Sequence, residues 1–251
     1  YLTITNIMLV TAPLSVSFLI SDSNYSLVYT LSSLIIIPLY FLIKKFKDTK
    51  EIKIQHINVR QTLKKCLDNK NLYNILISHT ILQLFYGFMV IYTPIYLQKY
   101  IGFSWSEIGV IFTIMLLPFI LFELPIGELE DDKYGEKEFL TIGFIIMGIS
   151  ALIISFIHVK DFWLWTVILF ISRIGASLVE ISTESYFFKQ VSKEQTDIVG
   201  MFRIGRPLAL ILAPVIATIV LQFIPFQYIF IIVGSIMIVG TRYSLALKDT
   251  K

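Results

Sequence analysis

The chain has 251 residues, of which 56% are hydrophobic and 16% are charged, and its formal net charge is +3. Soluble domains average about 45–50% apolar and about 25% charged residues, so this composition excludes an ordinary soluble protein and indicates an integral membrane protein. The single cysteine, Cys66, also excludes a disulfide within the chain.

Eight apolar runs follow one another along the sequence, each near the ~20 residues that a membrane-spanning helix needs. They cover residues 2–20, 24–43, 72–98, 105–127, 139–158, 161–188, 198–222 and 226–247. Because the bilayer interior offers no hydrogen-bond partners, spanning segments satisfy their backbone groups internally as helices. The sequence therefore predicts an all-α fold, a polytopic membrane helix bundle with about eight transmembrane helices.

The connection between the second and third runs, residues 44–70, is strongly basic. It holds nine Lys or Arg residues and three acidic residues. Loops rich in Lys and Arg remain on the cytoplasmic side of a membrane, and eight alternating crossings counted from this loop place 15 Lys or Arg residues inside and two outside. The remaining four lie within apolar runs: Arg173, Arg203, Arg206 and Arg242. We therefore expect a multi-pass protein of the lipid bilayer, in the bacterial cell (inner) membrane, with residues 44–70 and the C-terminus in the cytoplasm.

Two interpretations of this basic segment remain open. Ile57, Val59, Leu63 and Leu67 alternate with basic residues at near-helical spacing, which fits an amphipathic helix on the inner membrane face. A solvated tether whose charge only sets the topology fits as well. The segment carries no nucleic-acid-binding motif, so we expect no nucleic-acid partner.

The connection between the fourth and fifth runs carries the most informative motif. Gly127, Leu129 and Asp131, followed by D-K-Y-G-E-K, resemble the loop signature of the major facilitator superfamily, G-x-L-x-D-(R/K)-x-G-(R/K)-(R/K). One additional residue separates Asp131 from Gly135, so either Asp131 or Asp132 takes the place of the family's loop aspartate. An ordinary acidic turn with glycines at its tight bends is the alternative interpretation.

The resemblance implies both a fold and a function. In this family, two six-helix bundles joined by a linker move a solute by alternating access. On that pattern, residues 1–43 form the last two helices of the N-terminal bundle, residues 44–70 the cytoplasmic linker and residues 71–251 the C-terminal six-helix bundle, with four further helices expected upstream. The resemblance implies a secondary transporter of a small-molecule solute that acts as a single chain, is not an enzyme and needs no cofactor. Coupling to protons remains open.

Charged residues near the cytoplasmic ends of the apolar runs predict an inner gate. In the family, loop acids and helix-end arginines hold this gate closed. We expect Arg203 and Arg206 to pair with the acids nearest in depth, namely Glu123, Glu184 and either Asp131 or Asp132. The turn glycines Gly127 and Gly135 complete the predicted gate. In the alternative, the arginines extend to lipid phosphates as topological anchors.

Polar residues in the middle of apolar runs predict a path for solute or protons, since an ionisable group at this depth is costly. In the sixth run, Arg173, Ser177 and Glu180 fall on one face of a helix. The third run carries a second such face: His79, Gln83 and Tyr86. We expect the two faces to line the path between the bundles, with Glu180 as the best-placed proton acceptor. The alternative for each residue is a hydrogen bond between helices.

Two other classes of function share parts of this pattern. A transporter-like membrane sensor or assembly factor without transport activity would have the same helices. A membrane enzyme or a metal site would need clustered His, Asp or Cys residues, whereas His56, His79 and His158 are scattered over different elements. No stretch of the sequence identifies the solute.

Overall fold

The computed structural model describes residues 2–19, 26–44, 59–132, 135–192 and 195–248, and these residues form helices and loops without a strand. The elements in chain order are α1 (Leu2–Leu19), α2 (Ser26–Ile43), α3 (Val59–Asp68), α4 (Lys70–Tyr96), η1 (Leu97–Ile101), α5 (Trp105–Leu116), α6 (Pro118–Leu121), α7 (Glu123–Asp132), α8 (Glu136–Ile154), α9 (Phe162–Gln190), α10 (Thr196–Val220), η2 (Phe226–Tyr228) and α11 (Ile229–Leu245).

Seven stretches of the described chain are long and apolar enough to cross a membrane, and one of them combines α5, α6 and most of α7. The first predicted run also forms a helix, α1, of 18 residues. The predicted all-α bundle of membrane-spanning helices is therefore confirmed.

Local capping sequences set where several helices begin. Ser104 and Glu107 form a capping box at the start of α5, in which each side chain accepts a hydrogen bond from the other residue's backbone N–H. At the start of α9, the Asp161 carboxylate accepts a hydrogen bond from the backbone N–H of Leu164 at 2.9 Å. These side chains satisfy backbone groups that the first helical turn leaves without partners.

The predicted run 105–127 is not one continuous helix. Pro118 has no backbone N–H and its ring obstructs the preceding turn, and the N–H of Leu117 bonds to the carbonyl of Ile114 at 3.2 Å instead of continuing the regular ladder. A second break at Phe122 separates α6 from α7. The segmented part faces α4, because the ring of Phe119 lies 6.1 Å from the ring of Tyr86.

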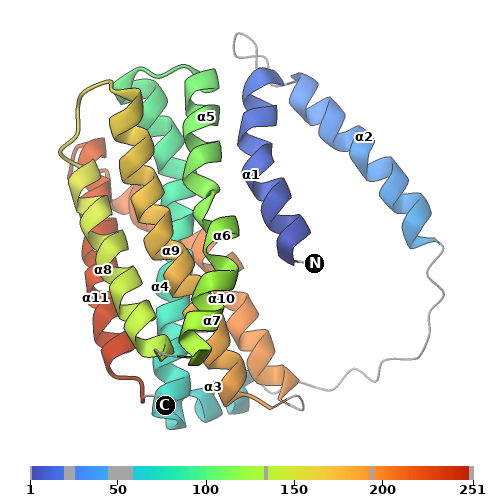
Figure 1. Cartoon of the computed structure of the whole chain (residues 1–251), viewed down its shortest axis with the longest axis vertical. Coiled ribbons are helices and arrows are strands. Elements are labelled where there is room, and N and C mark those ends of the chain that lie inside the picture. The colour runs from blue at the N-terminus through green and yellow to red at the C-terminus, as the bar shows by residue number, and fades with distance from the viewer. Residues whose placement is uncertain (1, 20–25, 45–58, 133–134, 193–194, 249–251) are drawn as a thin grey trace.

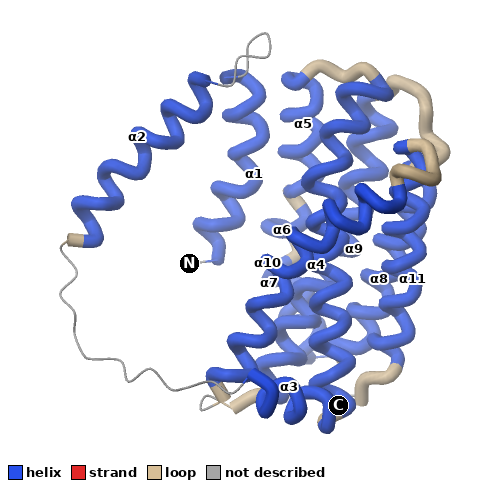
Figure 2. Tube along the Cα trace, turned by 180° about the vertical axis from the view of Figure 1, so that it is seen from behind, coloured by secondary structure: helices blue, strands red, loops and turns tan. Residues whose placement is uncertain are grey.

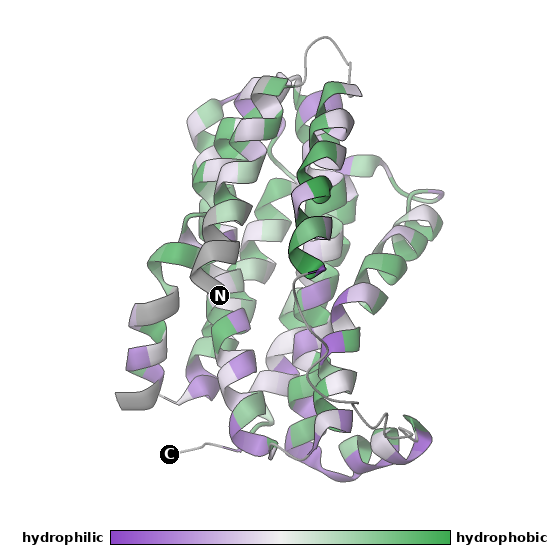
Figure 3. Cartoon of the chain, turned by 90° about the vertical axis from the view of Figure 1, so that its right-hand side faces the viewer, coloured by the Kyte–Doolittle hydropathy of each residue, from purple (hydrophilic) through white to green (hydrophobic). Residues whose placement is uncertain are grey.

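Successive long helices alternate in direction, so their connections gather at two ends of the bundle (Figures 1 and 2). We call the end that carries α3, the start of α8 and the start of α10 the linker end, and the end that carries η1 and η2 the far end. Polar residues concentrate at the linker end, whereas the rest of the bundle is mainly apolar (Figure 3). The end of α7 and the start of α8 lie at the same end of the bundle as the basic α3, as the charge pattern predicts.

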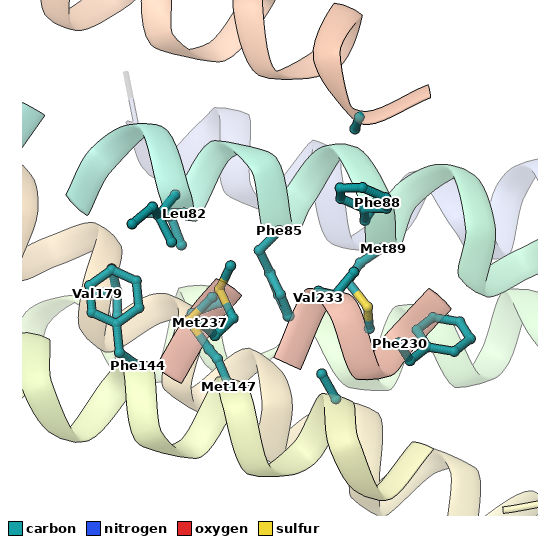
Figure 4. Packing of buried hydrophobic residues seen from close by; sticks show 14 of the residues in the cluster. Leu82, Phe85, Phe88, Met89, Phe144, Met147, Val179, Phe230, Val233 and Met237 are labelled. Atoms are coloured by element: carbon teal, nitrogen blue, oxygen red, sulfur yellow. The ribbon is translucent and has the colours of Figure 1, made fainter. Parts of the chain in front are cut away.

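Buried side chains from α4, α8, α9 and α11 form the core (Figure 4). Small residues let α8 approach its neighbours closely, as is common between membrane helices. A Cβ atom on Gly175 of α9 would lie 2.7 Å from the carbonyl oxygen of Gly143 on α8, and one on Gly234 of α11 would lie 2.8 Å from the carbonyl oxygen of Gly148. Close packing at these two positions holds α9 against α8 at Gly143 and α11 against α8 at Gly148.

The first two helices lie beside this bundle (Figure 1). α1 packs against α5, where Gly109 leaves room for the buried side chain of Ser17. None of the described side chains of α2 is buried. The assignment of residues 1–43 to an N-terminal bundle therefore stays a prediction.

Candidate functional site

The structure brings two predicted path residues into direct contact. The hydroxyl of Tyr86 on α4 donates a hydrogen bond to the Glu180 carboxylate on α9 at 2.8 Å. Both side chains are half-buried and lie in the middle part of their helices. The periodicity of the two runs thus placed these residues on facing sides of neighbouring helices, and the structure pairs them.

Arg173 lies beside this pair and is almost fully buried, with 2% of its surface exposed. Its guanidinium carbon lies 5.1 Å from the centre of the Phe85 ring and 6.0 Å from that of the Tyr86 ring. Aromatic faces attract a guanidinium without using its N–H groups. Accordingly, Nε and Nη1 of Arg173 are buried and have no hydrogen-bond partner among the described residues.

The other three predicted path residues are buried but do not join this cluster through any described hydrogen bond. The ring of His79 stacks on that of Phe202 in α10, with 3.8 Å between centroids. The Ser177 hydroxyl donates to the backbone carbonyl of Ile174, one turn earlier. The Oε1 atom of Gln83 is buried without a described partner. Their role in a solute path remains a prediction.

The predicted gate residues gather toward the linker end, where Glu184, Arg203 and Arg206 are exposed. Among the described side chains, no ion pair joins either arginine to a carboxylate. Gly135 is the N-cap of α8 and Gly127 has open space around it. The remaining predicted gate acids have side chains outside the described part of the structure: Glu123, Asp131 and Asp132.

The linker helix α3 docks onto the bundle with one face. Thr62 and Cys66 are buried, and the Thr62 hydroxyl donates a hydrogen bond to Asp197 of α10 at 3.0 Å. Lys65 lies 3.4 Å from the same carboxylate oxygen. Burial and the Asp197 charge raise the pKa of the Cys66 thiol, despite the opposing effect of Lys65. Residues 59–68 are helical, but the docked face is not the predicted apolar one, because Val59, Leu63 and Leu67 are exposed and Ile57 lies outside the described residues. The choice between a helix on the membrane face and a tether stays a prediction.

The family of the chain follows from comparison with known sequences. Residues 75–249 match the Major Facilitator Superfamily, over more than half of the chain. The chain belongs to the Major Facilitator Superfamily. Members of this superfamily move small solutes across membranes and are generally transporters and not enzymes, so this chain is an integral, multi-pass membrane protein of a transporter family. A comparison with curated proteins found no match.

The superfamily loop is anchored by acids that the sequence analysis did not select. Glu130 and Glu136 are each only 1% exposed. Glu130 accepts a hydrogen bond from the Ser182 hydroxyl of α9, and Glu136 forms an ion pair with Lys189 at 2.6 Å. The charge pattern of residues 128–138 contained these acids, but periodicity across a turn does not indicate which of them faces α9.

The described residues contain no group of three or more His, Cys, Asp or Glu side chains that could hold a metal ion. The charged groups near the centre of the superfamily fold are Arg173 and Glu180, joined through Tyr86. Such an arrangement can exchange a proton and can bind an oxyanion, and it needs no bound cofactor for either.

Proposed function

We propose that the protein is a secondary transporter in which Tyr86, Arg173 and Glu180 lie on the path of a small solute or of protons. The observation that carries this proposal is the hydrogen bond between Tyr86 and Glu180 at 2.8 Å, in the middle of two membrane-spanning helices. Ionisable groups at that depth are costly and are retained where they bind or conduct. Transporters of this architecture bind their solutes at the same depth, between two bundles.

In this proposal the linker end is cytoplasmic and acts as the inner gate. The basic segment 44–70 and the C-terminus lie on that side because short Lys- and Arg-rich loops remain in the cytoplasm. The exposed charges of Glu184, Arg203 and Arg206 provide a surface that closes against the N-terminal bundle. Glu123 and either Asp131 or Asp132 are their proposed further partners, and their separation opens the path inward.

Proton coupling is a part of the proposal that rests on Glu180. A buried carboxylate binds a proton more readily than one in water, since desolvation disfavours the charged form. The Tyr86 hydroxyl donates to this carboxylate, and the Arg173 guanidinium lies over the ring of the same tyrosine. Glu180 is therefore the proposed site at which a proton binds and leaves during the transport cycle.

Transport in lipid vesicles tests this function. Full-length protein is reconstituted and screened with a panel of radiolabelled solutes in the absence of ATP. We expect accumulation of at least one solute, loss of that accumulation in Arg203→Ala, and recovery when Arg203→Glu is combined with Glu184→Arg. Arg242→Ala is the matched control, because Arg242 is an exposed arginine in the last turn of α11 outside the predicted gate.

Two outcomes contradict the proposal at different points. Unchanged transport in Arg203→Ala would contradict the gate role of Arg203 but not the transport function. Absence of flux for every solute, with folded protein in the vesicles, favours a transporter-like sensor or assembly factor.

A further inference from the structure

Arg173 is held in a way that leaves its binding groups free. The guanidinium lies over the faces of Phe85 and Tyr86, at 5.1 and 6.0 Å. Contact with a ring face uses the flat side of the guanidinium, while its N–H groups point outward in the plane. Nε and Nη1 find no hydrogen-bond partner among the described residues although both atoms are buried. Each of these two donors belongs to a positively charged group, so each suits an oxygen of an oxyanion such as a carboxylate or phosphate.

The nearest described acid does not use these donors. The Glu180 carboxylate accepts the hydroxyl of Tyr86 instead, and the charges of Glu180 and Arg173 both act on Tyr86. The Tyr86 side chain therefore lies between the two charged groups and is held there by its hydrogen bond. A hydrogen bond to a charged acceptor is about twice as strong as one to a neutral acceptor. Protonation of Glu180 thus loosens the side chain that covers Arg173.

Charge balance points in the same direction. Arg173 and Glu180 together are neutral, so an anion bound at Arg173 adds an uncompensated negative charge in a region of low dielectric. A proton on Glu180 restores neutrality. The other ionisable groups around Glu180 are Tyr86 of α4, Arg206 of α10, Glu184 on its own helix, and Glu123 of α7, whose side chain the structure does not describe. Arg206 is exposed, so water screens its charge more than that of Arg173.

We propose that the solute carries an oxyanion, a carboxylate or phosphate group, that binds Arg173. One proton binds Glu180 together with the solute, and the Tyr86 side chain separates Arg173 from Glu180 until then. This inference rests on the proposed transport function and specifies the chemical class of its solute. The anion and the proton bind together because each compensates the charge of the other, and either one alone would leave an uncompensated charge in a region of low dielectric.

Binding to purified full-length protein tests this inference without knowledge of the natural solute. The probes are acetate, lactate, benzoate and methyl phosphate, together with acetamide, lactamide and benzamide as neutral counterparts of the carboxylates. Ligand-induced shifts of the Tm are measured from pH 5 to pH 8 and converted to Kd. We expect a Tm shift with at least one anion and none with its amide. Arg173→Gln weakens that anion about 10-fold to 100-fold, as for loss of a charged hydrogen-bond partner.

The pH dependence identifies the proton site. If one proton accompanies the anion, its Kd in the wild-type protein rises by up to about tenfold per pH unit as the solution becomes alkaline. Glu180→Gln, which is permanently neutral, removes this slope and keeps tight binding at pH 8. Tyr86→Phe flattens the slope partly, because the cover no longer depends on Glu180. Glu138→Gln is the control, because Glu138 is an exposed acid of α8 outside the predicted gate and path, and this variant keeps the wild-type slope.

Several results would overturn the inference. Binding of the amides but not of the anions, binding by none of the anions, or full affinity in Arg173→Gln removes the anion site. If the Kd of Glu180→Gln depends on pH as in the wild-type protein, Glu180 is not the proton site. Arg173→Lys keeps the charge but not the planar guanidinium donors, and an unaltered Tm without ligand in that variant separates lost binding from lost folding. Anion binding without uptake into vesicles would support this binding site but contradict the proposed transport function. Uptake that does not depend on the charge of the solute would support transport but contradict the anion site.

Discussion

The two ends of the bundle differ in their main contacts, although the far end also has an exposed ion pair, Lys160 with Glu107 at 3.5 Å, and the linker end also has stacked rings, Phe187 and Phe202 at 4.1 Å. At the far end, aromatic rings from α4, η1, α9, η2 and α11 pack on one another, with Tyr96 at 5.3 Å from Phe230 and 5.8 Å from Trp165. At the linker end, charged and hydroxyl side chains join separate elements, as in the pairs of Lys189 with Glu136 and of Lys65 with Asp197. The first kind of contact depends on shape and the second on charge.

This difference suggests that the far end is rigid and that the linker end can change its contacts. Close packing changes little with small changes in hydration or protonation, so the aromatic contacts keep the far-end halves of these helices together as one unit. Charged contacts weaken when water or a competing ion reaches them. If the linker end opens and closes, as proposed, its reversible contacts are suited to that role. The predictions below test this contrast, beginning with the largest expected effect.

Removal of one buried aromatic side chain should break the far end. Trp165 is fully buried, and its indole N–H donates to the carbonyl of Val159 at 3.0 Å. Trp165→Ala leaves a cavity and an unpaired carbonyl and should lower the free energy of unfolding by about 3–5 kcal/mol. Trp163→Ala is the matched control, because 69% of Trp163 is exposed. Thermal unfolding in detergent measures both, and equal stability of the two variants contradicts the assignment of the far end as the rigid part.

Loss of the charged partner of Glu136 should weaken the linker end. Glu136 is buried, while the Lys189 side chain that pairs with it is 44% exposed. Lys189→Gln leaves a buried carboxylate with less compensation and should cost about 1–3 kcal/mol. Glu136→Gln in the same protein should recover most of that loss, since the uncompensated charge is then gone. A double-mutant cycle measures the coupling, and additive effects would show that the two side chains do not stabilise each other.

The docking of the linker helix should be the weakest of these contacts. Its ion pair is partly exposed, and exposed pairs contribute about 0.2–1 kcal/mol. Asp197→Asn should therefore release α3 only a few-fold more often. Cys66 is the only cysteine, so its alkylation at neutral pH reports release. Because burial and the Asp197 charge raise the pKa of its thiol, both undocking and the mutation lower that pKa and increase the reactive thiolate.

The control for this measurement is Asp68→Asn, which removes an exposed acid from the same helix. It should leave the alkylation rate within about twofold of the wild-type rate, as expected for a surface change away from specific contacts. Similar acceleration in both variants would mean that the net charge of the region, and not the contact with Asp197, governs docking.

The sequence predicted those features that depend on local periodicity. Apolar run length gave the membrane-spanning helices, the S-x-x-E pattern at Ser104 gave the start of α5, and helical spacing put Tyr86 and Glu180 on faces that meet. None of these three predictions used knowledge of how distant segments pack. The charge count also predicted that the end of α7 and the basic α3 share one end of the bundle.

Features that depend on the rotation of a short segment were beyond such reasoning. Glu130 and Glu136 belong to a stretch with six acids, and only the docking of α7 and α8 on α9 decides which two are buried. His79 shares a helix face with Tyr86, but the ring of Phe202 from α10 stacks on it. The break of the fourth run at Leu117 was signalled by Pro118, although proline within a membrane helix does not by itself specify a break.

The accessibility of one central position from the two sides of the membrane tests alternating access most directly. In full-length protein carrying Cys66→Ser and Tyr86→Cys, a membrane-impermeant maleimide is applied to right-side-out and to inverted vesicles. The account predicts reaction from both sides, and Arg203→Glu should raise the rate from the linker side while lowering it from the far side. Reaction from one side only, or rates that rise together on both sides, would contradict a carrier that opens its two ends in turn.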